Sequence, residues 1–492
     1  MTNIFSKHHL YYSFYRHFAS LYQERGFVMN WEVEVIRNKE DLIRDTQKFL
    51  QINSVMDEST AGPGRPFGEG VNASLTSLLE FGEKEGFTVK NLDGYAGHIE
   101  WGTGDEIVGV LCHVDVVPPG DGWTSDPFSA DIRDGRIYAR GAIDDKGPTM
   151  AAFYALKIVK DMQLPLSKRV RIIIGTDEES DWRCVDHYFK HEKMPDIGFA
   201  PDADFPIINA EKGIIDASLR IAKSASSDKD AKNGLLSFRS GLRLNMVPDA
   251  AEAVIEGDGL EAVHAYFSKW LEQSKTQGEA VSENGKLTLR VYGKSCHAME
   301  PDNGVNAGLK LAECLNGTEL DEAGKHFVKT VSDYFLNDTR GKKLKIDCRD
   351  DISGELTLNV GTFTYRKGEE GELGINIRYP VTSDSKVIRD AFTSAEEFRL
   401  EEFKDSKPHH VSADHPLVKT LQKVYEGQTG KKADLISIGG GTYARSLSAG
   451  VAFGPLFPGR PDSAHQKDEY IEIDDLLRST ALYAEAIYEL AK

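Results

Sequence analysis

Histidines and acids stand where strongly apolar runs end, although a strand covered on both faces should be apolar throughout. GVLCHVDVV (residues 109–117) reads as such a buried strand, yet it carries His113 and, two positions later, Asp115. Alternate residues of a strand share a face, so the Asp115 carboxylate can orient the second nitrogen of the His113 imidazole. A lone buried histidine is more often a satisfied core residue, so the role of His113 depends on what else gathers beside it.

Acids and a second histidine follow other strand-like or loop segments in the same way. Carboxylates crowded at the strand ends of an open α/β sheet repel one another and need a cation to offset that repulsion. Two histidines and several carboxylates suit a pair of divalent ions about 3.5 to 4 Å apart that share a bridging carboxylate and a water. The segments are GRIYARGAIDDKGP with Asp144 and Asp145, RIIIGTDEES with Asp177, Glu178 and Glu179, FAPDADFP with Asp202 and Asp204, and PDSAHQKDEY with His465.

The elements that must position these residues alternate between helix and strand patterns. We expect an α/β domain from about residue 31 to about 211, because its apolar runs predict helices at 73–84 and 149–162 and strands at 107–117 and 170–174. Amphipathic segments with long polar connections follow. The apolar pattern of buried helices and strands then returns in HPLVKTLQKVYEGQTG, ISIGGGTYARS and the last helix. The catalytic sheet is therefore predicted to be split in sequence around an inserted domain.

The predicted boundaries give a catalytic domain in two parts, residues 29–211 and 406–492, and an inserted lid domain, residues 212–405. Residues 1–28 stand outside this pattern and are aromatic and basic. They can be interpreted as an amphipathic membrane-surface or transit segment, or as an extension ahead of a true start at Met29. We expect the second, a non-native or disordered extension that contributes nothing to the site.

Length and composition exclude several classes of function. A chain of 492 residues, 40% of them hydrophobic, can bury more than one core. The formal net charge of −19 and the absence of a Lys/Arg block argue against nucleic acid as a partner. Five cysteines without paired spacing do not form a disulfide framework, and no apolar run is long enough to span a membrane. These features predict a cytoplasmic protein with no membrane partner.

Together the motifs resemble a known family. CHVDVVPPGDGW, ARGAIDDKGPT, GTDEESDW, FAPDADFPIINAEKG, LRLNMVP, NIRYP, GGGTYAR and SAHQKDE are similar to segments of the dinuclear metallohydrolases that include aminoacylases, carboxypeptidases and dipeptidases, and within them the PepV-like and Sapep-like bacterial dipeptidases. The similarity runs from about residue 30 to the end. It implies an α/β, phosphorylase/hydrolase-like zinc-peptidase catalytic domain with an inserted α+β two-lobed lid.

The resemblance also implies roles for particular residues. His113 and Asp202 would bind one metal, Glu179 and His465 the other, and Asp144 would bridge them. This mixture of imidazole and carboxylate ligands suits Zn²⁺, and Mn²⁺ or Co²⁺ could also bind to it. The peptide bond between Asp144 and Asp145 is expected to be cis. The implied catalytic residues are Glu178 as general base, Asp115 as the orienter of His113, and His297 as the oxyanion donor, and the implied substrate-binding residues are Arg378, Asn245, Gly440, Gly441 and Thr442.

The expected reaction is hydrolysis of the peptide bond of dipeptides. A water between the two metals loses its proton to Glu178, and the resulting hydroxide attacks a carbonyl polarised by one metal. Cys296 and His297 would face opposite ways in a strand, which argues against a cysteine–histidine dyad. An N-acyl amino acid deacylase on the same scaffold is the alternative enzyme, and a non-catalytic binding protein is the alternative of another class. A doubled lid that presents His297 from its own chain predicts an active monomer.

Overall fold

The computed structural model describes residues 29–222 and 231–492, so the expectation for residues 1–28 lies outside the described residues. The chain forms two compact units. The described part of the first comprises residues 29–196, 424–431 and 455–492, and that of the second comprises residues 197–222, 231–423 and 432–454. The domain boundaries predicted at 212 and 406 stay a prediction. Within the described ranges, no helix is both long enough and apolar enough to cross a membrane.

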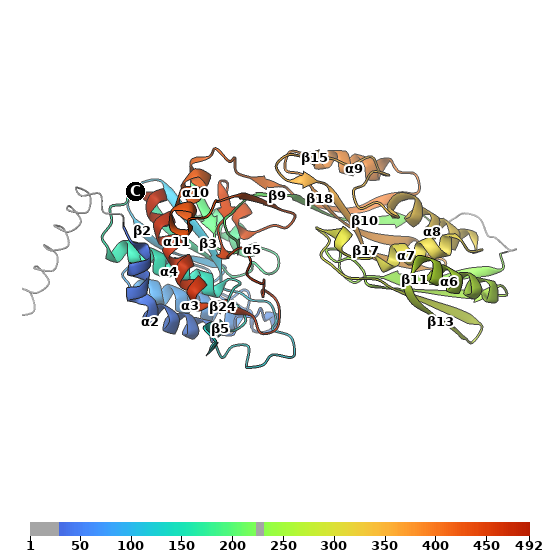
Figure 1. Ribbon diagram of the computed structural model, residues 1–492, viewed down its shortest axis with the longest axis horizontal. Helices are drawn as coiled ribbons and strands as arrows, with labels where there is room; N and C mark the ends of the chain where they lie inside the picture. Colours follow the sequence, from blue (N-terminus) through green and yellow to red (C-terminus); the bar gives the residue numbers. More distant parts are fainter. Residues whose placement is uncertain (1–28, 223–230) are drawn as a thin grey trace, which may run out of the picture. The chain divides into compact units, whose positions relative to one another are not determined.

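In the first unit four strands lie side by side in the order β1, β2, β6 and β3. Figure 1 labels β2 and β3 of this sheet. β3 pairs with β6 in parallel, whereas β1 with β2 and β2 with β6 are antiparallel. Helices α2, α4 and α11 pack on one another, and α4 and α11 also contact β3. The elements are α2 (Trp31–Leu50), α3 (Glu69–Lys84), β1 (Thr88–Leu92), β2 (Ala96–Gly102), β3 (Ile107–His113), α4 (Lys146–Asp161), β6 (Arg169–Gly175), α5 (Arg183–His191) and α11 (Ile473–Ala491), with a small sheet of β4 (Asp131–Arg133), β5 (Arg136–Tyr138) and β24 (Tyr470–Glu472).

Most elements predicted for this unit are present. Helix α2 begins where the side chain of Asn30 accepts a hydrogen bond from the Val33 amide, which satisfies one free N–H of the first turn. The strand predicted at 107–117 is wrong at its end, because β3 stops at His113. The amide of Val114 still bonds to the Gly175 carbonyl, but that of Val116 bonds to Ser54 instead, so the chain leaves β6 at this point. His113 therefore stands at the end of the strand.

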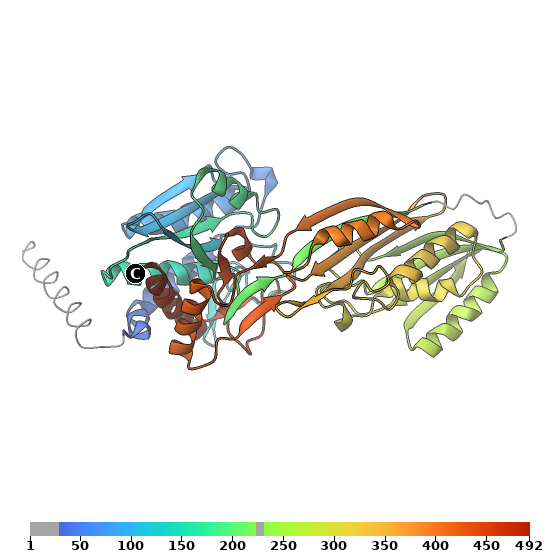
Figure 2. The ribbon, with the colours of Figure 1, turned by 90° about the horizontal axis from the view of Figure 1, so that it is seen from above.

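The second unit holds a large antiparallel sheet of eight strands in the order β13, β14, β12, β11, β17, β18, β10 and β19. Figure 2 shows these strands and their helices from above. Along β10 every second residue is buried, so one face of the sheet carries the core and the other is more polar. The elements are β10 (Gly213–Ile221), β11 (Asn233–Ser240), β12 (Ala250–Gly257), α6 (Leu260–Ser274), β13 (Gln277–Glu283), β14 (Lys286–Tyr292), α7 (Ala307–Asn316), α8 (Glu322–Phe335), β17 (Thr357–Arg366), β18 (Gly371–Tyr379), α9 (Ser385–Ser394) and β19 (Phe398–Ser406).

A second group of strands belongs to the same unit. β9 pairs with β20, β21 and β22, and β22 also pairs with β7 in parallel. Only Lys212 separates β9 from β10. The chain therefore passes from one sheet of this unit directly into the other. The elements are β7 (Ile197–Ala200), β8 (Ala203–Asp204), β9 (Ile207–Glu211), β20 (His409–His410), β21 (Leu435–Ile438) and β22 (Gly450–Ala452), while α10 (Pro416–Thr429) runs from the second unit into the first.

Candidate active site

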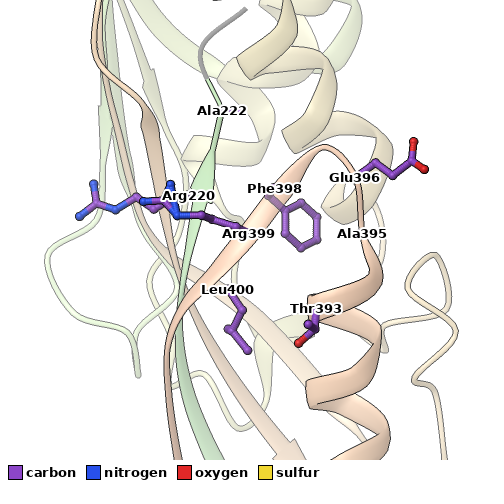
Figure 3. Close-up of a pocket in the computed structure, with 8 residues that line it drawn as sticks. All are labelled: Arg220, Ala222, Thr393, Ala395, Glu396, Phe398, Arg399 and Leu400. Atoms are coloured by element: carbon purple, nitrogen blue, oxygen red, sulfur yellow. The ribbon is translucent and has the colours of Figure 1, made fainter.

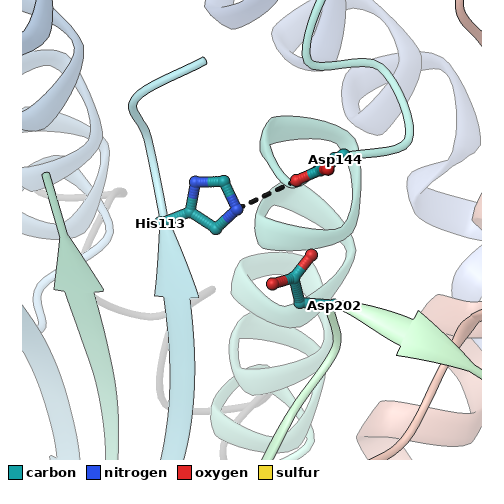
Figure 4. Close-up of side chains that lie close together, drawn as sticks. All are labelled: His113, Asp144 and Asp202. Atoms are coloured by element: carbon teal, nitrogen blue, oxygen red, sulfur yellow. Dashed lines mark hydrogen bonds and ion pairs between the residues drawn. The ribbon is translucent and has the colours of Figure 1, made fainter. Parts of the chain in front are cut away.

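His113 is fully buried at the end of β3, and both of its ring nitrogens face oxygen atoms. Nδ1 lies 3.0 Å from the backbone carbonyl oxygen of Asp115, and Nε2 lies 3.0 Å from Oδ1 of Asp144 (Figure 4). A carbonyl oxygen can only accept, so Nδ1 carries a proton and donates it. The Nε2 lone pair then faces a carboxylate oxygen, and a proton or a cation has to lie between them. This is the arrangement of a metal-ligating histidine whose other nitrogen is held by the protein.

A second histidine faces the other oxygen of the same carboxylate. Nε2 of His465 lies 3.0 Å from Oδ2 of Asp144 and 3.1 Å from Oε2 of Glu179. One ligand atom from each of these three residues lies within 4.8 Å of the others. Two ligands of one tetrahedral zinc, each about 2.0 to 2.1 Å from the metal, are separated by about 3.3 Å. The observed separations therefore fit ligands of a small divalent cation, and each oxygen of Asp144 is directed at a different imidazole.

Charges in this cluster perturb one another strongly. Hydrogen bonds to Asp144 and Glu179 raise the pKa of His465 to about 11. Burial opposes ionisation of Asp144, yet hydrogen bonds from His113 and His465 hold the pKa of Asp144 below its usual range. Burial raises the pKa of Glu179. The cluster thus stabilises positive charge between its imidazoles and carboxylates, as expected of a site that attracts cations.

Asp115 holds the turn that carries the two glutamates. Its Oδ1 accepts from the Glu178 amide at 3.2 Å and its Oδ2 from the Glu179 amide at 3.0 Å. The carboxylate also lies 3.5 Å from Nδ1 of His113, farther than the Asp115 carbonyl oxygen. Asp115 therefore contacts His113 mainly through its backbone, and its side chain fixes Glu178 and Glu179.

Sequence reasoning missed two residues that fix the Asp144 loop. Glu469 is fully buried; its Oε1 accepts from the amides of Ile143 at 3.0 Å and Asp144 at 3.3 Å, and its Oε2 accepts from Arg140 at 2.5 Å. Arg140 is almost fully buried as well. The two residues stand inside the motifs ARGAIDDKGPT and SAHQKDE, so their position in these motifs was the available signal. The peptide bond between Asp144 and Asp145 is cis, as expected.

Asp202 is the one predicted metal ligand that belongs to the second unit, where it follows β7. The predicted substrate-binding residues also belong to this unit. Arg378 is buried on β18, with Nε 2.9 Å from Oδ1 of Asn376 and Nη1 2.8 Å from the carbonyl oxygen of Gly439. Within the described residues, the other three N–H groups of its guanidinium have no hydrogen-bond partner. Burial lowers the pKa of Arg378 to about 10, so the group still carries its charge at neutral pH.

His297 and Asn245 lie on adjoining segments of this unit. The Ala298 amide donates to the Asn245 carbonyl oxygen at 2.9 Å, and His297 forms an isolated β-bridge with Met246. Nδ1 of His297 accepts from the Met299 amide at 3.2 Å, so the proton of the neutral ring sits on Nε2. Burial, with the charge of Arg378, lowers the pKa of His297. The thiol of Cys296 donates instead to the Glu300 carbonyl oxygen, which agrees with the absence of a cysteine–histidine dyad.

The glycine-rich loop is anchored at Thr442. Its amide donates to Oε2 of Glu211 at 3.0 Å and its hydroxyl to Oε1 at 2.5 Å. Glu211 is buried at the end of β9 and also lies 3.5 Å from Nε of Arg445. Both donors of Thr442 are therefore used within the protein, which leaves the amides of Gly440 and Gly441 as the groups that the loop offers to a ligand.

A cavity of about 380 Å³ lies elsewhere in the second unit, between the ends of β10, α9 and β19 (Figure 3). Arg220 and Arg399 line it, but Arg220 pairs with Glu372 and Arg399 with Glu370 and Glu401. No predicted catalytic or binding residue lines this cavity. Both arginines are thus already paired with carboxylates, and the lining includes no residue of the metal-ligand cluster.

Comparison with known proteins agrees with the residue pattern. The chain matches the family described as Peptidase family M20/M25/M40 over residues 109–489. It is 80% identical over 464 residues to "Putative dipeptidase YtjP" of Bacillus subtilis (strain 168), which covers 94% of this chain and 100% of the relative. It is 44% identical over 465 residues to "Putative dipeptidase SH1171" of Staphylococcus haemolyticus (strain JCSC1435), covering 94% and 99%.

Solved structures share the fold. Aminoacylhistidine dipeptidase from Vibrio alginolyticus aligns with a TM-score of 0.56 at 16% identity over 92% of this chain and 96% of that one. Human carnosine dipeptidase 1 aligns with a TM-score of 0.53 at 15% identity, covering 94% and 98%. The family match spans most of the chain and the bacterial relatives match nearly their whole length, so the chain belongs to peptidase family M20/M25/M40.

Proposed function

We propose that the chain is a metal-dependent dipeptidase that hydrolyses unblocked dipeptides. The observation that carries this proposal is the position of Asp144, whose two oxygens each lie 3.0 Å from Nε2 of a different histidine, His113 or His465. A carboxylate that faces two imidazoles suits the bridge between two divalent cations. The dipeptidase names of the two bacterial relatives support the substrate class.

We assign His113 and Asp202 to one cation, Glu179 and His465 to the other, and Asp144 to both. The residues fit such a pair, because the Nε2 lone pair of His113 faces Asp144 while its Nδ1 is fixed by a carbonyl oxygen. Imidazole and carboxylate ligands suit Zn²⁺ and also admit Mn²⁺ or Co²⁺. When bound, the cations would lower the pKa of a water and polarise the carbonyl of the substrate.

The protein's own groups move the protons. We assign Glu178 as the general base that takes the proton of the attacking water and returns it to the leaving amine. The hydrogen bond from its amide to Asp115 fixes the backbone from which its side chain projects. His297 is assigned as the donor to the developing oxyanion, which its Nε2–H suits because Nδ1 already accepts a hydrogen bond and the ring is neutral at pH 7.

Arg378 is assigned to the C-terminal carboxylate of the substrate, together with the Asn245 side chain and the amides of Gly440 and Gly441. A buried guanidinium without a carboxylate partner is costly, and an anionic ligand would offset that cost. Within the described residues, three N–H groups of Arg378 have no partner, so they can form the planar pair of bonds that a carboxylate accepts. Thr442 contributes by anchoring the loop to Glu211.

The test combines metal analysis with a substrate panel. Purified wild-type chain and Glu178→Gln are expected to hold about two divalent metals each, because Glu178 is assigned as a base and not as a ligand. The variant should lose turnover of free dipeptides, and activity above a few per cent would remove Glu178 from this role. The same panel includes N-acetyl and N-succinyl amino acids. A preference of the wild type for these substrates would replace the dipeptidase proposal with an N-acyl amino acid deacylase.

A further inference from the structure

A line of polar side chains crosses the eight-stranded sheet beneath the groups proposed to bind the substrate carboxylate. Asp216 of β10, Asn376 of β18 and Asn359 of β17 are direct partners across three neighbouring antiparallel strands, so their side chains share one face. We call these three residues the polar row. Ile375 and Ile377, on either side of Asn376, belong to the apolar core on the opposite face. The polar row therefore lies outside the core that holds the sheet together.

Asn376 connects this row to Arg378. Arg378 lies two residues further along β18 and donates through Nε to Oδ1 of Asn376 at 2.9 Å. The amide nitrogen of Asn376 donates to Oδ1 of Asp216 at 2.6 Å. A carboxylate can only accept, so Asp216 fixes which end of the amide faces Arg378. Because Asn376 is only 1% exposed, water cannot replace either bond.

Asn359 connects the row to the loop that carries Asn245. Its amide nitrogen donates to the carbonyl oxygens of Leu244 at 3.0 Å and Met246 at 2.9 Å, the residues on either side of Asn245. The loop lies directly on the sheet at two glycines. A Cβ at Gly374 would come within 2.2 Å of Leu244 Cδ2, and one at Gly361 within 2.5 Å of Leu244 Cα. The position of Asn245 is thus set by β17 and by β18, the strand that also carries Arg378.

We propose that the polar row fixes the spacing between Arg378 and Asn245 for the carboxylate of the substrate, with Asn376 and Asn359 as positioning residues. This inference rests on the proposed role of Arg378 and Asn245. Apolar side chains could cover this part of the sheet without the cost of burying amides. Here the buried amides are instead bonded to the guanidinium itself and to the two carbonyls that flank Asn245. A binding group that is held in place before the ligand arrives loses less freedom on binding.

The test compares a dipeptide with its C-terminal amide. Asn376→Leu and Asn359→Leu are each expected to raise KM for the free dipeptide about tenfold, which corresponds to about 1.4 kcal/mol, with kcat unchanged. KM for the amide should change less than about twofold, because no carboxylate is bound. Asn376→Leu should add nothing further in an Arg378→Ala background. The matched control is Asn233→Leu, because Asn233 is 3% exposed and bonded to Glu319, away from Arg378.

The outcomes separate the two claims. If Arg378→Ala raises KM equally for the dipeptide and for its amide, Arg378 does not bind the substrate carboxylate. If Arg378→Ala discriminates between them but Asn376→Leu does not, or if the two effects are additive, the positioning role is overturned. If Asn376→Leu fails to fold, Asp216→Ala tests the same connection from a half-buried position, since it frees the Asn376 amide to turn. An unchanged KM for the free dipeptide in that variant would also overturn the proposal.

Discussion

Replacement of Gly361 by alanine tests whether the Asn245 loop needs direct contact with the sheet. Gly361 stands at the register shift between Val360 and Thr362 in β17. A Cβ there would lie 2.5 Å from both Cα and the carbonyl oxygen of Leu244, whereas ordinary contact begins at 3.4 Å. The difference, 3.4 − 2.5, requires the loop backbone to retreat by about 0.9 Å. A misplacement of about 1 Å at a substrate-positioning group can cost about 100-fold in rate.

We therefore expect Gly361→Ala to lower kcat/KM for a free dipeptide by about 100-fold. Overpacking of this kind costs about 1 to 3 kcal/mol, so the melting temperature should fall by about 2 to 12 °C. Steady-state kinetics on the metal-loaded protein and a thermal unfolding curve on the same preparation measure the two effects. The loss of activity should be far larger than the fraction of protein unfolded at the assay temperature can explain.

Gly427→Ala is the matched control, because a Cβ at this exposed position of α10 would meet nothing within 4 Å. Alanine is the better helix former, so this variant should keep full activity and be as stable as the wild type or slightly more stable. Wild-type kcat/KM in Gly361→Ala would show that the loop does not depend on its contact with β17. A fall in stability with unchanged kinetics would separate packing from function and refute the reasoning.

Three further predictions concern the metal ligands, the assembly and the oxyanion donor. His465→Ala should reduce bound metal from about two ions to about one per chain, measured by elemental analysis. The control His187→Ala removes a surface pair with Asp93 and should keep both metal ions. Equal metal contents in the two variants would contradict the assignment of His465. Sedimentation should show an active monomer, and an obligate dimer that loses activity on dilution would disprove this. NMR titration of His297 should give a pKa below 6.5, because its burial disfavours the charged ring; a higher value would argue against a neutral donor.

The sequence predicts most of the first unit because its signals are local. Apolar periodicity alone places the end of α3 at Lys84 and β6 within a residue of its ends. The residues that gather at the candidate metal site could be named from their motifs, and His113, Asp144, Glu179 and His465 do lie together. His113 ends β3 and Glu179 follows β6, as expected of chemistry-bearing side chains in α/β folds, whereas Asp144 and His465 come from loops.

What the sequence did not reveal depends on contacts between distant segments. Glu469 reaches the Asp144 amide across 325 positions of the chain, and no periodic pattern predicts such a bond. The exit of the chain from β3 after His113 depends on the competing Ser54 carbonyl. The polar row requires the register of three strands, and a shift of one residue would turn Asn376 to the other face. Residue types indicated the chemistry, but not which side chains hold others in place.

Arg445 links the two chain segments that connect the sheets of the second unit. The chain runs from β9 to β10 through Lys212 and returns from β19 to β20 through Lys407 and Pro408. Nη2 of Arg445 donates to the carbonyl oxygens of both Lys212, at 3.2 Å, and Lys407, at 2.7 Å. The two connections are thereby tied to each other beside the loop that Glu211 anchors. Bending between the two sheets would stretch these bonds, at about 0.5 to 1.5 kcal/mol each, so Arg445 stiffens this junction together with the bond from Arg378 to Gly439.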